Sequence, residues 1–275
     1  MKFNKQEATI YQQDKAKELS KKIESAKDKL KELSKELKEK FNLPLTNDLR
    51  IDINGFQDVF PSLTIQQDIK KIQSLENNFK GEVGQSQNPA NSGYILEILK
   101  TLLFNKYLNN DFIAVRSSNY DDYVNKIDNI ILNKKTGEIV CAFDEVASMS
   151  GEAFERKKKQ VLDLNKQGGV FLKYGFSLKE NKIEKGSFEN LTCFYLPLEE
   201  KYLWKLLEEF NFNFNVENQY EINILIALLS IINQQISFLN LSKLDDEKSK
   251  GIKKLQGFIL NYLQFLNNKK GQSIK

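Results

Sequence analysis

Residues 120–148, YDDYVNKIDNIILNKKTGEIVCAFDEVAS, decide how this chain is expected to fold. Two apolar stretches, each long enough for a strand, are joined by the short polar segment 134–137, which ends in glycine. A glycine there supplies a positive φ, which favours a hairpin. Asp128 lies in the first stretch, and Asp144 and Glu145 lie at the end of the second. The sequence therefore predicts two neighbouring antiparallel strands that carry carboxylates in otherwise apolar surroundings.

Helical and strand patterns continue on both sides of this pair. Apolar residues at helical spacing predict helices over 5–42, 64–79, 92–109, 151–166, 200–210, 218–241 and 250–267. Strands are expected at 112–116, 126–132, 138–147, 170–178 and 191–198, and the alternation in 210–216 is compatible with a short edge strand. Glycine, serine, asparagine and proline predict a loop over 81–93. Strands flanked by helices on one sheet are typical of an α/β fold.

The composition excludes several kinds of chemistry. The 275 residues are 40% hydrophobic and 28% charged, which predicts a soluble protein with a real core. The chain has 38 Lys, three Arg and no His, so Ser-His and Cys-His nucleophile pairs and His-ligated zinc are excluded. Acid and base roles must fall to carboxylates, Lys, Tyr or metal-bound water. Cys141 and Cys193 lie in apolar strand-like runs and are expected to be buried thiols.

Charge and hydropathy indicate an intracellular protein. The first residues contain no apolar run typical of a signal peptide, and the most apolar run, 222–232, is too short to span a bilayer. We therefore expect a cytoplasmic location and no membrane partner. The net charge of +4 resides in residues 1–42, with 12 Lys and 8 acidic groups, and the remainder is neutral. Bulk charge alone thus does not indicate a nucleic-acid binder, although a local basic patch remains compatible with it.

The N-terminal helix carries a narrow apolar seam. Its members alternate spacings of three and four residues, as in a heptad repeat: Ala16, Leu19, Ile23, Ala26, Leu30, Leu33 and Leu37. Such a seam needs a partner helix, which can be a second copy of the chain, another helix of the same chain, or a different protein. We favour self-association, so that a homo-oligomer or another helical partner is expected to bind through residues 12–40.

Helix-breaking and loop-forming residues divide the chain into four expected segments. Pro44 ends the first helix. We expect a coiled-coil-like helix over 1–42, a linker with a short helix over 43–90, an α/β core over 91–200, and a helical extension over 201–275.

The carboxylates of the core suggest a metal site. Glu97 lies in a helix among apolar neighbours, and Asp128, Asp144 and Glu145 lie on adjacent strands. Burying isolated carboxylates is costly, and sharing a divalent cation with oxygen ligands lowers that cost. The four residues are therefore candidate ligands of Mg²⁺ (or Mn²⁺). Strand side chains alternate, so only one of Asp144 and Glu145 can face the site.

Structural interpretations of the same residues also exist. Glu97 can be a polar position of an amphipathic helix, and Asp144 and Glu145 can simply end a strand. The neighbouring pair 121–122 can be part of a solvated loop or can contribute a metal or substrate contact.

The order of helix, three strands, helix and strand over about residues 90–198 resembles the core of the PD-(D/E)XK nucleases. The resemblance rests on the helix with Glu97, the strand with Asp128, the tight hairpin, and the acidic pair that ends the next strand. It implies a restriction-endonuclease-like mixed sheet flanked by helices. It also implies that Asp128 and Glu145 (or Asp144) bind Mg²⁺, with Glu97 completing the site, and that they activate water for phosphodiester hydrolysis.

The motif lysine is missing from its usual place. It would fall at Ala147 if Glu145 is the motif acid, or at Val146 if Asp144 is. In the PD-(D/E)XK nucleases, a lysine from a neighbouring element can replace it. The candidates are Lys157, Lys158 and Lys159 in the next helix and Lys173 on the next strand, and the sequence does not choose among them.

Three functions are compatible with these patterns. The first is a Mg²⁺-dependent nuclease that hydrolyses DNA or RNA, with nucleic acid as its partner. The second is a catalytically inactive protein on a nuclease scaffold that acts in nucleic-acid or protein binding and assembly through its N-terminal helix. The third is a coiled-coil interaction protein whose acidic residues are all structural.

Overall fold

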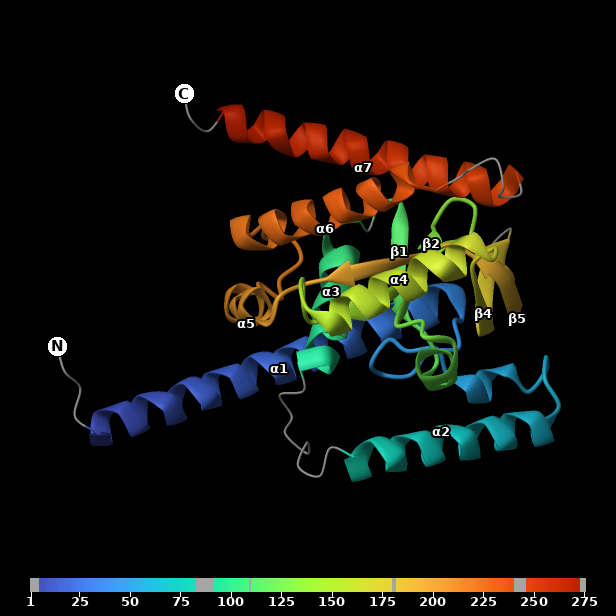
Figure 1. The fold of residues 1–275 in the computed structure, drawn as a ribbon, viewed down its shortest axis with the longest axis horizontal. Coiled ribbons are helices and arrows are strands. Elements are labelled where there is room, and N and C mark those ends of the chain that lie inside the picture. Colours follow the sequence, from blue (N-terminus) through green and yellow to red (C-terminus); the bar gives the residue numbers. More distant parts are fainter. Residues whose placement is uncertain (1–4, 83–91, 109, 180–181, 240–245, 273–275) are drawn as a thin grey trace.

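A mixed α/β fold, in which a small sheet is flanked by helices, forms the body of the molecule (Figure 1). The computed structural model describes residues 5–82, 92–108, 110–179, 182–239 and 246–272. Most of the loop expected over 81–93, and the part of the proposed linker from 83 to 90, lie outside the described residues. No helix in these ranges is long and apolar enough to cross a membrane.

The elements follow the expected order closely. The helices are α1 (Lys5–Phe41), α2 (Ser62–Glu82), α3 (Ser92–Tyr107), α4 (Glu152–Lys166), α5 (Glu200–Glu209), α6 (Gln219–Ser237) and α7 (Asp246–Gln272). Two short helices are added, the 3₁₀ helix η1 (Ile53–Phe56) and the π-helix η2 (Asp121–Asn125). The strands are β1 (Phe112–Arg116), β2 (Asn129–Asn133), β3 (Ile139–Val146), β4 (Val170–Lys179), β5 (Lys182–Leu191) and β6 (Cys193–Pro197).

Four of the strands form a mixed sheet in the order β1-β2-β3-β6. The first three pair antiparallel, and β6 pairs parallel to β3. Glycine ends the hairpin as predicted, because Gly137 has a φ of 72° between β2 and β3. The chain between the parallel strands runs through α4 and a separate hairpin, β4–β5.

Two strand expectations were wrong in detail. The stretch 170–178 does form a strand, but it pairs with β5 in a two-stranded sheet and does not join the main one. Its partner is polar and largely exposed, so apolar periodicity did not reveal it. The stretch 210–216 forms no strand, because its phenylalanines pack together after α5, with the rings of Phe210 and Phe212 5.1 Å apart.

Helices cover both faces of the main sheet. On one face, Phe104 of α3 packs against Phe143 of β3, with ring centroids 5.5 Å apart. On the other face, Lys157 of α4 contacts Asp144, the next residue along β3. Because consecutive strand residues point to opposite faces, α3 and α4 sandwich the sheet. The side chain of Gln235 on α6 pairs with the backbone N–H and C=O of Tyr195 and so covers the edge at β6.

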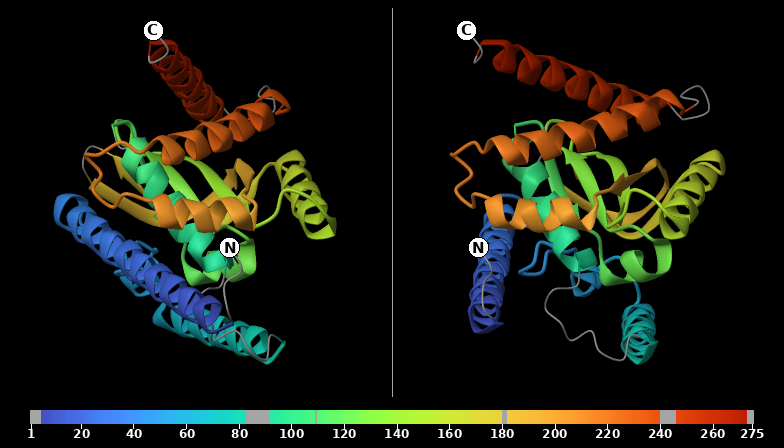
Figure 2. Two further views of the ribbon diagram at one scale, coloured as in Figure 1. Left: turned by 90° about the vertical axis from the view of Figure 1, so that its left-hand side faces the viewer. Right: turned by 60° about the vertical axis from the view of Figure 1, so that its left-hand side comes forward.

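The N-terminal helix packs its seam on the same chain. Ile23, Ala26, Leu30 and Leu37 are buried in the core that also includes residues of α3, α5 and α6. Figure 2 shows α1 lying along one side of the body, opposite the α6–α7 hairpin. Of the three partners that the seam allowed, another part of the same chain is therefore the one that covers residues 23–37. Self-association through the part of α1 before residue 23 stays a prediction.

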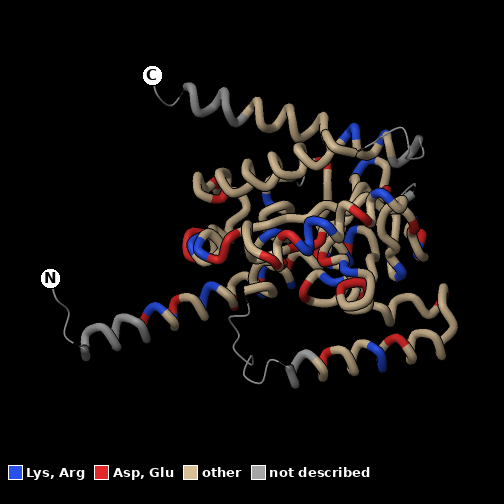
Figure 3. Tube along the Cα trace, viewed as in Figure 1, with Lys and Arg blue, Asp and Glu red and all other residues tan. Residues whose placement is uncertain are grey.

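A buried ion pair joins α3 to α6. Lys106 and Glu221 are both almost completely buried, and their charged atoms are 2.7 Å apart. The carboxylate also accepts from the Tyr107 hydroxyl at 2.9 Å and from the backbone N–H of Asn211 at 2.6 Å. Figure 3 shows charged residues of both signs along much of the described chain, whereas α6 is almost free of them. This pair fixes the helical extension to the α/β core.

Replacing Leu30 tests the packing of α1. The side chain is fully buried, so we expect Leu30→Ala to lower the free energy of unfolding by about 3 kcal/mol through lost burial and a residual cavity. The measurement is urea unfolding, with the oligomeric state followed by sedimentation. The exposed Leu63→Ala serves as control and is expected to stay within about 0.5 kcal/mol. A change of oligomer size without loss of stability would contradict an intrachain role for this seam.

Candidate functional site

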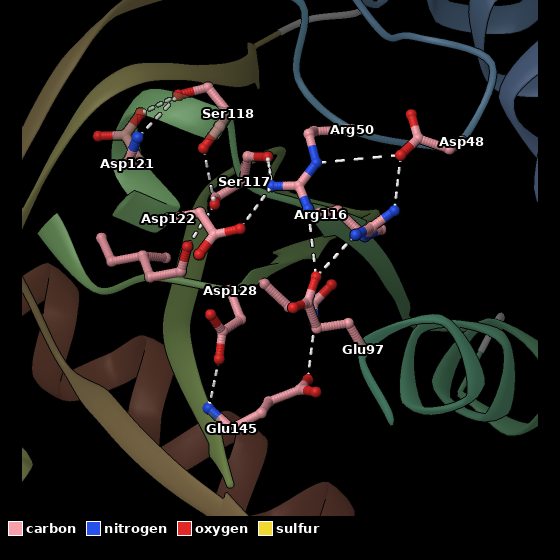
Figure 4. A network of polar contacts seen from close by, with 12 residues as sticks. Asp48, Arg50, Glu97, Arg116, Ser117, Ser118, Asp121, Asp122, Asp128 and Glu145 are labelled. Atoms are coloured by element: carbon pink, nitrogen blue, oxygen red, sulfur yellow. Dashed lines mark hydrogen bonds and ion pairs between the residues drawn. The ribbon is translucent and has the colours of Figure 1, made fainter. Parts of the chain in front are cut away.

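Three carboxylates from separate elements meet beside the main sheet. Glu97 comes from α3, Asp122 from η2, and Asp128 from the residue that precedes β2. One oxygen of each lies within 4.8 Å of the others. Figure 4 shows the three carboxyl groups turned towards one another. The structure thus brings together two of the four predicted ligands and adds Asp122, which the sequence allowed only as an alternative to a solvated loop.

The π-helix η2 is held in place by its first acid. Asp121 is buried and accepts hydrogen bonds from the Ser118 hydroxyl at 2.7 Å and from the Asn125 amide at 2.7 Å. It also accepts from the backbone N–H groups of Lys173 and Tyr174 on β4. These neutral donors satisfy Asp121, so its role is structural. The next residue, Asp122, is thereby aimed at Glu97 and Asp128.

Each of the three carboxylates is bound through one oxygen. Glu97 Oε2 accepts from Arg50 at 3.1 Å and from Arg116 at 2.7 Å. Asp122 Oδ2 accepts from Arg50 at 3.0 Å, and Asp128 Oδ2 accepts from the backbone N–H of Glu145. Among the described residues, no N–H or O–H donor contacts the second oxygen of any of the three. Protein donors therefore orient the carboxylates while leaving an oxygen of each for a further ligand.

Two of the three arginines of the chain lie here. Arg50 comes from the segment between α1 and η1, where it forms a β-bridge with Arg116 at the end of β1. Leu49 adopts a left-handed φ of 61° just before it, and this turn directs Arg50 and Asp48 towards the site. Asp48 lies 2.6 Å from Arg116. The segment expected to be a linker therefore supplies residues to the site.

Asp144 and Glu145 lie on opposite faces of β3. Asp144 Oδ1 is 2.5 Å from Lys157 Nζ on the α4 side. Glu145 points to the α3 side, where it accepts from the Asn129 amide at 2.6 Å and lies 3.9 Å from Lys100 Nζ. Neither belongs to the set of three mutually close carboxylates, but both adjoin Asp128.

Of the candidate lysines, Lys157 reaches the carboxylates. Its ammonium lies 4.0 Å from Asp128 Oδ2 and donates to the backbone carbonyl of Glu145. Lys158 instead pairs with Glu155 on the same helix, and Lys173 pairs with Asp68 at 2.5 Å. Within the described ranges, neither of these two ammonium groups lies within 4.0 Å of a site carboxylate, and Lys159 is exposed on α4.

Burial raises the pKa of most acids in the site. Desolvation, followed by the nearby charge of Glu97, raises the pKa of Asp128 well above its ordinary value. Desolvation also raises the pKa of Asp122 and of Asp144 and brings the pKa of Glu145 to about 7. Desolvation lowers the pKa of Lys100 to about 8. These shifts mean that the protein alone does not fully stabilise the ionised carboxylates.

The charge balance agrees with that conclusion. Ionised, the three sets of ion pairs near Asp128 together carry a net formal charge of −2. The six acids are Asp48, Glu97, Asp122, Asp128, Asp144 and Glu145, and the four cations are Arg50, Lys100, Arg116 and Lys157. Glu145 Oε2 is in addition buried without a hydrogen-bond partner. Carboxylate oxygens with a deficit of two positive charges fit a hard divalent cation such as Mg²⁺ or Mn²⁺.

Several residues of the site had no sequence signal of their own. Asp48, Arg50 and Arg116 belong to segments read as linker or strand, and Lys100 looks like any polar position on a helix. One available hint was the rarity of arginine, because 38 lysines accompany only three arginines. A planar guanidinium can bridge two carboxylates in a fixed geometry, which an ammonium does less well.

Comparisons with known proteins give no relatives: no protein-family model matches the chain, and no curated protein or solved structure matches it. The site must therefore be interpreted from its own chemistry.

Without metal, we expect the protein to lose stability as the pH rises from 5 to 7.5. Glu145 has a folded-state pKa of about 7 against an ordinary value of 4.5, so the folded state binds more protons in this window. The unfolded state ionises first as the pH rises, which lowers the free energy of unfolding by about 2 kcal/mol over this window. Urea unfolding in EDTA at both pH values measures it.

The matched variants are Glu145→Gln and Glu189→Gln, the latter on the exposed face of β5. The first should reduce the pH dependence, although the raised pKa values of Asp122, Asp128 and Asp144 keep part of it, and the second should leave it unchanged. Equal pH dependence in wild type and Glu145→Gln would rule out this assignment.

Proposed function

We propose that this protein is a metal-dependent nuclease of the PD-(D/E)XK kind, which hydrolyses phosphodiester bonds in DNA or RNA. The convergence of Glu97, Asp122 and Asp128 next to a β2–β3 hairpin is the observation that carries the proposal. The element order α3, β1, β2, β3, α4, β6, with β6 parallel to β3, supports a restriction-endonuclease-like core. Two of the three arginines of the chain pair with Glu97. Because a guanidinium holds a carboxylate in a fixed geometry, this concentration of arginine supports a functional site.

In this proposal Glu97, Asp122 and Asp128 would each hold the ion with one carboxylate oxygen. A bound divalent ion would lower the pKa of water and reduce the charge on the phosphate. The backbone N–H of Glu145 fixes the carboxyl group of Asp128, and Arg50 and Arg116 fix that of Glu97. Hydrogen bonds of this kind orient the metal ligands, and removing one typically lowers metal affinity or activity 10- to 100-fold.

In this proposal, Lys157 replaces the missing motif lysine. Its side chain is 28% exposed, whereas Lys100 is completely buried and cannot touch a substrate. The ammonium lies 4.0 Å from Asp128 Oδ2 and is partly exposed, so a phosphate oxygen could reach it. There it would bind the phosphate and stabilise the charge that develops in the transition state.

The overall reaction is balanced by water alone. The oxygen of water forms a bond to phosphorus, the phosphorus–oxygen ester bond breaks, and the departing oxygen takes a proton that originates from the water. The products are a phosphate monoester and a free hydroxyl. No oxidant, reductant or nucleotide cofactor is required.

The direct test is cleavage of supercoiled plasmid, single-stranded DNA and RNA by purified protein in Mg²⁺ or Mn²⁺. We expect products that depend on the ion and disappear in EDTA. Asp128→Asn should abolish cleavage, because the residue lies at the centre of the three carboxylates. Cleavage that survives in Asp128→Asn at the wild-type rate would come from a contaminant and would remove the proposal.

Replacing Lys157 tests the assignment of the lysine. We expect Lys157→Met to lower kcat by about 10²-fold, the usual effect of losing one electrostatic contact to a transition state. Arg156→Met is the matched control, because Arg156 is an exposed cation on the same helix. Equal losses in the two variants would show that general surface charge, and not Lys157, is responsible.

A catalytically inactive binding protein on the same scaffold is the second candidate. The observation that favours it is the arginine pairing, because Arg50 and Arg116 already bind Glu97, and Arg50 binds Asp122. A permanent network of this kind needs no ion. It would give no rise in melting temperature with Mg²⁺ or Mn²⁺, whereas a bound ion stabilises the folded state by mass action. A metal-dependent rise that Asp128→Asn removes would exclude this candidate.

A further inference from the structure

Asp128 stands between two groups of oxygens. On one side it meets Glu97 and Asp122, with one oxygen of each residue within 4.8 Å of the others. On the other side, Asp128 and Asp144 both lie beside the ammonium of Lys157. If only the carboxylates are considered, they would therefore provide two cation positions that share Asp128.

The two sides differ in how the protein supplies positive charge. On the first side, Arg50 and Arg116 bind Oε2 of Glu97 and Oδ2 of Asp122, and the second oxygens stay without a donor among the described residues. On the second side, a single ammonium sits among the oxygens. Lys157 Nζ is 2.5 Å from Asp144 Oδ1 and 4.0 Å from Asp128 Oδ2, and it also donates to the carbonyl of Glu145.

We propose that Lys157 occupies the position of a second cation, so that each chain binds one divalent ion, through Glu97, Asp122 and Asp128. The inference rests on the metal site of the proposed function. The ammonium pairs with Asp144 Oδ1 at 2.5 Å, donates to the backbone carbonyl of Glu145 and lies 4.0 Å from Asp128 Oδ2. Oxygens of this kind are the ligands that a hard cation requires. A second ion in the same place would be repelled by this fixed positive charge at a few ångströms.

This arrangement has a chemical consequence for the reaction. A second metal ion in hydrolytic sites stabilises charge on the oxygens that enter or leave phosphorus. Here the ammonium is placed to supply part of that stabilisation without a second ion. Lys157 is then both the cation that limits the number of ions and the group that faces the phosphate.

The experiment counts ions. Full-length protein, stripped with EDTA and dialysed, is titrated with Mn²⁺, and the free ion is measured by its electron paramagnetic resonance signal. We expect one bound Mn²⁺ for wild type and for the exposed-cation control Arg156→Ala. We expect two for Lys157→Ala, and one again for Lys157→Ala combined with Asp144→Asn, which removes an oxygen of the second position. Two ions or none in wild type, or one ion in Lys157→Ala, would overturn the proposal.

A second variant serves if Lys157→Ala does not fold. Asp144→Asn in the wild-type background should keep its single ion with less than about a threefold change in Kd, whereas Asp122→Asn should weaken binding at least about tenfold. Loss of the ion in Asp144→Asn would contradict the assignment. The nuclease proposal is judged separately: one bound ion without cleavage refutes catalysis alone, and cleavage with two bound ions refutes only the role of Lys157.

Discussion

The concentration of negative charge around Asp128 is the constraint on which the rest of the site depends. A buried carboxylate without compensation is expensive, and several of them close together also repel one another. Cations from different parts of the chain compensate part of this negative charge. Arg50 precedes the core, Arg116 ends β1, and Lys157 comes from α4. Compensating the charge therefore requires that these segments assemble around one point.

The compensation is incomplete in a specific way. Arg50 binds Glu97 Oε2 and Asp122 Oδ2, Arg116 binds the same oxygen of Glu97, and the backbone N–H of Glu145 binds Asp128 Oδ2, so each carboxylate is oriented through one of its oxygens. The net formal charge of −2 and the raised pKa values of Asp128 and Glu145 indicate that the protein alone does not fully stabilise its ionised carboxylates. Perturbed carboxylates of this kind concentrate at functional sites, although structural ion-pair networks also produce them. Our proposals follow the first interpretation because the oxygens converge.

Much of the fold followed from local patterns. The hairpin at residues 134–137 and the helix with Glu97 were predictable, because apolar periodicity and glycine conformations act over short distances. The β5 strand was not, because most of its residues are polar and its apolar residues do not recur with the period of a strand. Asp122 was weighed as an alternative to a solvated loop, since no local rule predicts that five residues form a π-helix anchored on β4.

The lysines illustrate the same limit. Lys157, Lys158 and Lys159 are adjacent and chemically identical, so the sequence could place a lysine near the site but could not choose one. Helical rotation of about 100° per residue separates them in space, and only Lys157 contacts Asp144 and Asp128 in the described structure. The choice depends on how α4 docks against the sheet.

The order of elements, the hairpin and the apolar seam of α1 are properties of the sequence by itself, since each depends on spacing between near neighbours. Tertiary structure alone decided what the seam packs against, that Asp144 and Glu145 serve opposite faces, and that Arg50 joins Glu97 across 47 positions of the chain. The physical reason is that ion pairing and packing act through space, and residues distant in sequence carry no mark of the partner that folding will bring to them.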